Sequence, residues 1–152
     1  MSSSKLRAAL ENGESLAGRD LSASDPFVFD LSGCDLSGAD LSSPHVPSAV
    51  SGQAWPRSWH DHQQVVLRRV RLAGAQLDGA DLSRVVAIRC VFRGASMRNA
   101  LLVAADLTQA DLRDADLRGA DLGEAVLSGA RLDGVIWDDS TRWPAGFKLP
   151  HV

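Results

Sequence analysis

A short histidine-bearing segment offers the most evident chemistry in this 152-residue chain. His60 and His62 flank Asp61, so in an extended segment both imidazoles point to one side. Such a pair could begin a metal site, or place a general base beside Trp55 and Trp59. No third ligand stands at a diagnostic spacing, so we predict no metal site, no catalytic residue and no cofactor. The plain interpretation is a solvated loop whose tryptophans pack on the rest of the protein. If the protein binds a partner, this loop is the expected contact, because exposed tryptophans are common hot spots of interfaces. Its candidate contact residues are Trp55, Trp59, His60 and His62.

Four arginines define a second candidate surface. Arg93 and Arg113 are twenty residues apart, as are Arg98 and Arg118. Each directly follows a large apolar residue, so we expect all four to point outward on two neighbouring faces. They could bind an anion or a partner, or they could pair with stacked acids in a mixed solubilising face. Acids interleave with these arginines and no aromatic platform accompanies them, so the sequence does not favour nucleic-acid binding. The acids in the same two columns are Asp78, Asp133 and Asp138.

A third set is an aspartate that directly precedes many of the large apolar residues. Calcium binding or carboxylate catalysis would use such residues, but an aspartate can also bond nearby backbone N–H groups at turns. Because they recur with the repeat described below, we assign them to the structure of the turns. They are Asp20, Asp30, Asp35, Asp40, Asp81, Asp106, Asp111, Asp116 and Asp121.

The elements that position these residues follow from a period of five. From Val65 to Asp139 a large apolar residue, the centre, recurs every fifth residue, and a smaller apolar residue stands two places before it. Steps of five would carry the centres around an α-helix and would alternate faces on a strand. The centres are Leu67, Leu72, Leu77, Leu82, Ala87, Phe92, Met97, Leu102, Leu107, Leu112, Leu117, Leu122, Leu127, Leu132 and Trp137.

A short extended side followed by a corner buries this pattern. The smaller residue and the centre are two apart, so both face one way, and the chain must then bend before the next pair. Glycine often stands two places after the centre, for example at Gly74, Gly94 and Gly119, where it would allow a tight or left-handed bend. Sides and corners in succession predict a coil that stacks on itself, a solenoid.

The motif resembles that of the pentapeptide-repeat family, A(D/N)LXX. It reads Ala105-Asp106-Leu107, Ala110-Asp111-Leu112, Ala115-Asp116-Leu117 and Ala120-Asp121-Leu122. The resemblance covers about Glu14 to Asp139, apart from one break. It implies an all-β solenoid, a right-handed square (quadrilateral) β-helix with four pentapeptides per turn, in which residues twenty apart stack.

We expect one domain covering 1–152. Its parts are an N-terminal capping helix over 3–12, repeats over 14–43, an insertion over 44–64, repeats over 65–139 and a C-terminal cap over 140–152. The insertion, Pro44 to Gln64, contains three prolines and no leucine, so we favour an extruded loop over an irregular coil. Trp137, Trp143 and Phe147 are expected to close the C-terminal end.

Composition limits the remaining possibilities. The net charge is −3, and it divides into an arginine-rich section, Val65–Asn99, and an acidic section, Ala100–Asp139. Cys34 and Cys90 occupy small inward positions on different faces, so we expect free buried thiols. No apolar run reaches the ~20 residues that span a membrane, and the N-terminus lacks a signal-peptide core, so we expect a cytoplasmic protein.

Three functions remain open, of which we favour a non-catalytic protein-binding module that uses the 44–64 loop. The resemblance implies a second, a bacterial DNA mimic that binds type II topoisomerase (DNA gyrase) and confers antibiotic resistance. Those relatives are strongly acidic and usually dimerise through a C-terminal helix, and this chain departs on both counts. The third is a small-molecule-binding protein or biosynthetic enzyme that uses His60, Asp61 and His62, so whether the chain is an enzyme stays open.

Overall fold

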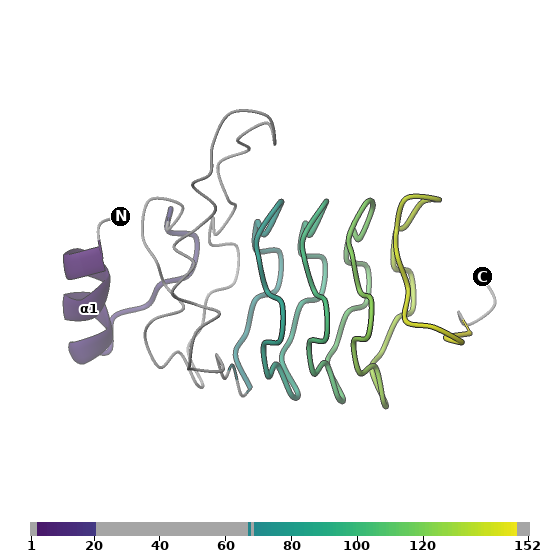
Figure 1. Cartoon of the computed structure of the whole chain (residues 1–152). Coiled ribbons are helices and arrows are strands. Elements are labelled where there is room, and N and C mark those ends of the chain that lie inside the picture. Colours follow the sequence, from purple (N-terminus) through teal and green to yellow (C-terminus); the bar gives the residue numbers. More distant parts are fainter. Residues whose placement is uncertain (1–2, 21–66, 68, 149–152) are drawn as a thin grey trace, which may run out of the picture.

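A computed structural model of the protein describes residues 3–20, 67 and 69–148 (Figure 1). These residues form one N-terminal helix and a series of coils stacked along one axis. The insertion 44–64, with Trp55, Trp59, His60 and His62, lies outside the described residues. So do Cys34 and the repeats from Leu21 to Ser43.

Helix α1 spans Ser3–Glu11 and ends one residue before the end of the predicted helix, 3–12. Gly13 takes a left-handed φ of 65°, the N–H of Glu14 bonds the carbonyl of Ala9 at 2.8 Å and the N–H of Gly13 bonds that of Leu10 at 3.1 Å. This pattern is a Schellman stop signal. Leu6 and Ala9 are buried, but the role of α1 as a cap stays a prediction, because residues 21–66 are not described. Within the described part, no helix is long and apolar enough to cross a membrane.

The predicted coil is present from Leu67 onward. Parallel bridges join residues twenty apart, one bridge for every five residues, as in Val86↔Asp106 and Val91↔Asp111. Four bridged sides therefore complete one turn. Each side adds backbone bonds to the next coil, for example from the N–H of Leu107 to the carbonyl of Val126 at 2.9 Å and from the N–H of Val126 to the carbonyl of Ala105 at 2.8 Å. Each side holds a single bridged residue, so the expected all-β solenoid contains no longer strand in its described part.

The inward residues form four columns that fill the coil. From Leu67 to Leu122 every centre is at most 3 % exposed, and the smaller residues between them are equally buried. The undersized centre Ala87 is followed by Phe92, the largest fully buried side chain. Cys90 is buried and free, as predicted for a small inward position.

The corners all use a left-handed residue two places after the centre. Six are glycines, such as Gly74 (φ 65°), and eight are other residues, such as Ala104 (φ 56°), between Arg69 and Gly134. The N–H of the next residue bonds the carbonyl of the centre, for example Ala75 to Leu72 at 3.1 Å. A single positive φ at the third of four residues is the pattern of a type II turn.

The C-terminal coil departs from the period by one residue. Asp121 bridges Arg142, a step of twenty-one, so Thr141 takes a small inward position and is buried. Trp143 then follows in the place of a centre and packs on the core, edge-on to Trp137 with ring centroids 6.4 Å apart and stacked on Phe147 at 5.5 Å. The three aromatic residues thus contact one another at this end of the described coil, and their role as a cap stays a prediction.

Candidate functional site

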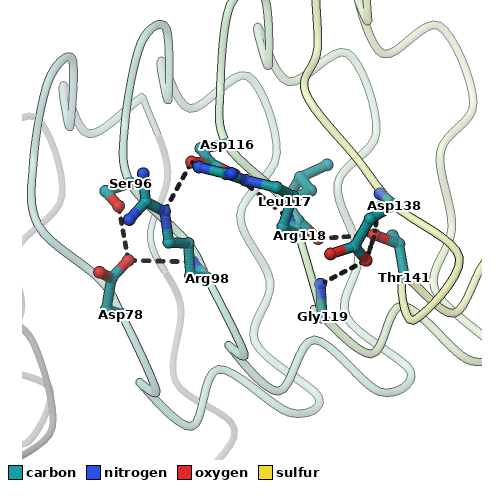
Figure 2. A network of polar contacts seen from close by, with 9 residues as sticks. All are labelled: Asp78, Ser96, Arg98, Asp116, Leu117, Arg118, Gly119, Asp138 and Thr141. Atoms are coloured by element: carbon teal, nitrogen blue, oxygen red, sulfur yellow. Dashed lines mark hydrogen bonds and ion pairs between the residues drawn. The ribbon is translucent and has the colours of Figure 1, made fainter.

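The most developed polar feature of the described residues runs along one outer side of the coil (Figure 2). It comprises Asp78, Ser96, Arg98, Asp116, Arg118 and Asp138, and we call it the polar ladder. The side that carries these residues has centres Leu77, Met97, Leu117 and Trp137, so the ladder spans successive coils. Residues directly before and after a centre both point outward, because they are two apart on an extended side.

Asp116 is the hub of the polar ladder. Its carboxylate accepts two bonds from Arg118, Nε at 2.9 Å and a terminal nitrogen at 2.6 Å, and one from Nε of Arg98 at 2.6 Å. Its side chain is only 11 % exposed, whereas the side chains of Arg98 and Arg118 are 50 % and 43 % exposed. Hydrogen bonds from Arg118, and then from Arg98, hold the pKa of Asp116 well below its usual value, although partial burial opposes them.

The motif aspartates act as the predicted turn residues. In the described repeats, the N–H of the residue after a centre makes no backbone bond to the next coil, and where an aspartate precedes the centre, its side chain accepts this N–H. Examples are Ser83 to Asp81 at 3.0 Å, Thr108 to Asp106 at 3.0 Å and Gly123 to Asp121 at 2.9 Å. This local bond explains why the repeat favours aspartate at that place.

Arg93 and Arg113 lie on the neighbouring side, as predicted, with their backbones joined through the bond from Gly94 N–H to the Arg113 carbonyl at 2.9 Å. Arg113 forms a two-pronged pair with Asp111, at 2.8 and 2.6 Å. Arg93 contacts Asp114 at 3.3 Å, and both of these side chains are 58 % exposed. The hydrogen bonds from Arg113 lower the pKa of the Asp111 carboxyl.

The expected ion-pair partners in the same columns were wrong. Arg113 does not pair with Asp133, and Arg118 does not pair with Asp138, within the described residues. Both arginines turn to the aspartate two residues earlier on their own side, which projects from the same face at short range. Asp78 instead bonds the backbone N–H of Arg98 at 2.9 Å and the hydroxyl of Ser96 at 2.6 Å.

Asp138 closes the polar ladder at the C-terminal end. Its Oδ1 accepts the N–H of Gly119 at 3.1 Å, where other coils use a backbone carbonyl. The same oxygen accepts the hydroxyl of Ser140 at 2.6 Å and the hydroxyl of Thr141 at 3.3 Å. These bonds, the Ser140 hydroxyl first, lower the pKa of Asp138. This role of Asp138 was not predicted from the sequence; the one extra residue between Trp137 and Trp143 was the available signal.

The polar ladder has the chemistry of a structural surface of mixed charge. Its three carboxylates, of Asp78, Asp116 and Asp138, exceed its two guanidiniums by one charge, and both guanidiniums bond Asp116. Among residues 3–20, 67 and 69–148, no three His, Cys, Asp or Glu side chains gather as a metal site would require. The thiol of Cys90 bonds the Leu67 carbonyl, and burial raises its pKa to about 11, so it stays protonated at neutral pH.

Comparison with known families agrees with this geometry. The sequence profile of the family described as Pentapeptide repeats matches residues 66–102 and 100–136, with eight copies. The chain belongs to the pentapeptide repeat family. This membership supports the β-helix solenoid that the bridges describe.

Several solved structures are similar to the chain. A pentapeptide repeat protein from Nostoc PCC 7120 is 33 % identical, with 56 % of this chain and 78 % of that one covered and a TM-score of 0.31. Rfr23 from Cyanothece 51142 is 21 % identical, with coverage of 92 % and 98 % and a TM-score of 0.30. QnrB1, a plasmid-mediated fluoroquinolone resistance protein, is 18 % identical, with coverage of 71 % and 50 % and a TM-score of 0.30. No curated protein matches the chain significantly.

Proposed function

We propose that this protein is a non-catalytic protein-binding module that presents the 44–64 loop from a rigid solenoid. The observation that supports the proposal is the coil itself, in which bonds between successive coils and buried columns fix the outward residues in place. Binding residues are often carried by loops that a rigid scaffold positions. Trp55 and Trp59 are the proposed anchors, with His60 and His62 beside them.

The four arginines are the proposed second contact surface. Each already pairs with a carboxylate: Arg93 with Asp114, Arg98 and Arg118 with Asp116, and Arg113 with Asp111. An anion would therefore have to compete with these carboxylates. A protein partner that contacts the exposed flanks of the paired side chains fits this arrangement better.

Affinity capture tests the loop. The intact protein, a Trp55→Ala/Trp59→Ala variant and an Arg93→Ala/Arg113→Ala variant are used to capture proteins from an extract of the source cells, with identification by mass spectrometry. We expect the tryptophan variant to lose the partner that the intact protein captures, and the arginine variant to weaken its capture less. Capture of the same partner at undiminished yield by the tryptophan variant would refute the loop as the anchor.

A second candidate is a topoisomerase-binding role, which the acidic section Ala100–Asp139 favours. That section carries nine acids against Arg113, Arg118 and Arg131. A DNA gyrase supercoiling assay with and without a quinolone tests it directly. Protection or inhibition at micromolar protein supports the role, and no effect at that concentration removes it.

The third possibility, small-molecule chemistry at the loop, is tested in the same protein. If His60 and His62 hold a metal, Zn²⁺ should raise the melting temperature of the intact protein and have no such effect on a His60→Ala/His62→Ala variant. Equal responses of the two proteins would exclude a metal held by these histidines.

A further inference from the structure

One outer corner of the coil carries a self-complementary set of charges. Arg84, Ala104 and Glu124 stand two places after their centres, at steps of twenty, with φ values of 60°, 56° and 60°. Backbone bonds stack them on successive coils, from Arg84 N–H to the Val103 carbonyl and from Ala104 N–H to the Gly123 carbonyl, both at 2.8 Å. Along the coil axis, this corner therefore carries a basic, then a small, then an acidic residue. Two coil steps separate the two charged residues by roughly 10 Å.

These charges are not used within the chain. Neither Arg84 nor Glu124 forms an ion pair or side-chain hydrogen bond within the described residues, and both are exposed. Glycine would fit each corner with less strain, because in the left-handed region a Cβ crowds the following carbonyl oxygen. The charged residues therefore occupy this corner despite the conformation that it requires.

Apolar side chains surround the same corner. Leu101 is 43 % exposed on one adjoining side, and Val126 is 45 % exposed on the other. Val86 and Val103 are half-buried beside them. The flanking carboxylates of Asp106 and Asp121 are already bonded, to Thr108 and to Arg142. The corner thus combines an apolar centre with one free charge at each end.

We propose that this corner, Arg84–Ala104–Glu124 with Leu101 and Val126, binds a second copy of the chain in antiparallel orientation. A twofold axis beside Ala104 and perpendicular to the coil brings Arg84 opposite Glu124 of the second copy, twice. The same operation sets Val86 against Val126 and Leu101 against its own copy. It also brings the carboxylate of Asp106 opposite its own copy and that of Asp81 opposite Asp121, but each of these carboxylates is already bonded within its own chain. A parallel pair would instead oppose Arg84 to Arg84 and Glu124 to Glu124, so these two corner charges select the antiparallel arrangement.

The contact is narrow, because it spans three coils along one edge, so we expect a weak dimer in the micromolar range or above. The contact involves neither the 44–64 loop nor the four arginines. A test of the dimer can therefore fail or succeed independently of the proposed binding function.

A charge-swap cycle tests the dimer. Sedimentation velocity of the full chain over a concentration series at low salt gives the dissociation constant. We expect Arg84→Glu and Glu124→Arg each to weaken dimerisation about tenfold or more, and the double variant to restore it to within about threefold of the original value. Each substitution introduces a residue type that already stands at the same corner on another coil, so the fold should be kept. Far-ultraviolet circular dichroism checks that it is.

Arg69→Glu is the matched control, because Arg69 is an exposed corner residue (φ 58°) at a different corner of the coil. It should leave the dimer unchanged. A chain that stays monomeric at several hundred micromolar would overturn the proposal. Equal weakening by Arg69→Glu, or failure of the double variant to recover, would overturn it as well.

Oxidative cross-linking tests the position of the axis separately. Ala104→Cys should give a disulfide-linked dimer, since Ala104 faces its own copy. Gln109 (φ 57°) stands at the next corner, at the other end of the side that follows Ala104, so Gln109→Cys should not give a disulfide-linked dimer. Equal cross-linking of the two variants would contradict the antiparallel contact.

Discussion

The inside and the outside of the coil follow different rules. Inside, a small and a large apolar residue alternate on successive sides, and Ala87 is the one undersized centre among the described repeats. Outside, the residues that flank the centres change from coil to coil: Asp78, Arg98, Arg118 and Asp138 share one column. The interior therefore specifies the fold, and the exterior can vary from coil to coil without changing it.

The strongest test of this contrast compares adjacent residues. Phe92 is fully buried, and Phe92→Ala should lower the free energy of unfolding by about 3–5 kcal/mol through lost burial and a cavity. Arg93→Ala should lower it by no more than about 1 kcal/mol, because the side chain of Arg93 makes only an exposed ion pair with Asp114, at 3.3 Å. Urea unfolding followed by circular dichroism measures both. Equal losses would mean that the interior is not what specifies the fold.

The contrast can be sharpened within the exterior. Asp116→Ala removes the hub of the polar ladder and leaves Arg98 and Arg118 without their carboxylate, so we expect a loss of about 1–3 kcal/mol. Asp114→Ala is the matched control, because that aspartate makes one exposed contact and should cost about 0.5 kcal/mol or less. The same urea titration applies. A loss for Asp114→Ala as large as that for Asp116→Ala would show that the polar ladder is not special.

The corners should respond to backbone strain alone. At Gly94 (φ 64°) a new Cβ would meet nothing within 4 Å, so only the left-handed backbone opposes a side chain. Gly94→Ala should therefore cost about 1 kcal/mol in thermal or urea unfolding. Ala104→Gly is the reverse substitution at an equivalent corner and should not destabilise. A Gly94→Ala variant that is not destabilised, or an Ala104→Gly variant that is, would contradict the left-handed corner.

The smallest expected effect is in the pH dependence of stability. The pKa of Asp116 is lowered in the folded state, so the unfolded chain binds more protons in acid. The ionised carboxylate of Asp116 contributes fully to the free energy of unfolding above the unfolded-state pKa of about 3.9. This contribution is lost as the pH falls toward the lower pKa of the folded state. Asp116→Asn should therefore flatten the fall in stability below about pH 4 in acid titrations followed by circular dichroism. An unchanged slope would remove Asp116 from that role.

Much of the fold could be predicted because packing repeats. The period of five identified the buried centres and the corners, and the stop at Gly13 followed from local backbone chemistry. The polar ladder could be predicted only in outline. Stacking in a column suggested Asp138 for Arg118, but two side chains on one extended side lie closer, and Arg118 pairs with Asp116.

The C-terminal register was also not predicted, although the step of six from Trp137 to Trp143 signals it. The one added residue moves Thr141 inward and leaves Gly119 to bond the side chain of Asp138. Such shifts depend on which of several nearby groups completes a hydrogen bond. The loop 44–64 carries no period, so its residues could be proposed as contacts only from their types.

Cross-linking between coils tests the stacking of residues twenty apart most directly. Thr108 and Ser128 directly follow centres on adjacent coils, next to the bond from Gln109 N–H to the Ser128 carbonyl at 2.9 Å. With Cys34 and Cys90 replaced by alanine, a Thr108→Cys/Ser128→Cys variant should oxidise to an intramolecular disulfide, because adjacent coils bring the two Cα atoms within bonding range. Thr108→Cys/Asp133→Cys, a step of twenty-five onto the neighbouring side, should stay reduced. A disulfide in the second variant but not in the first would contradict the four-sided coil.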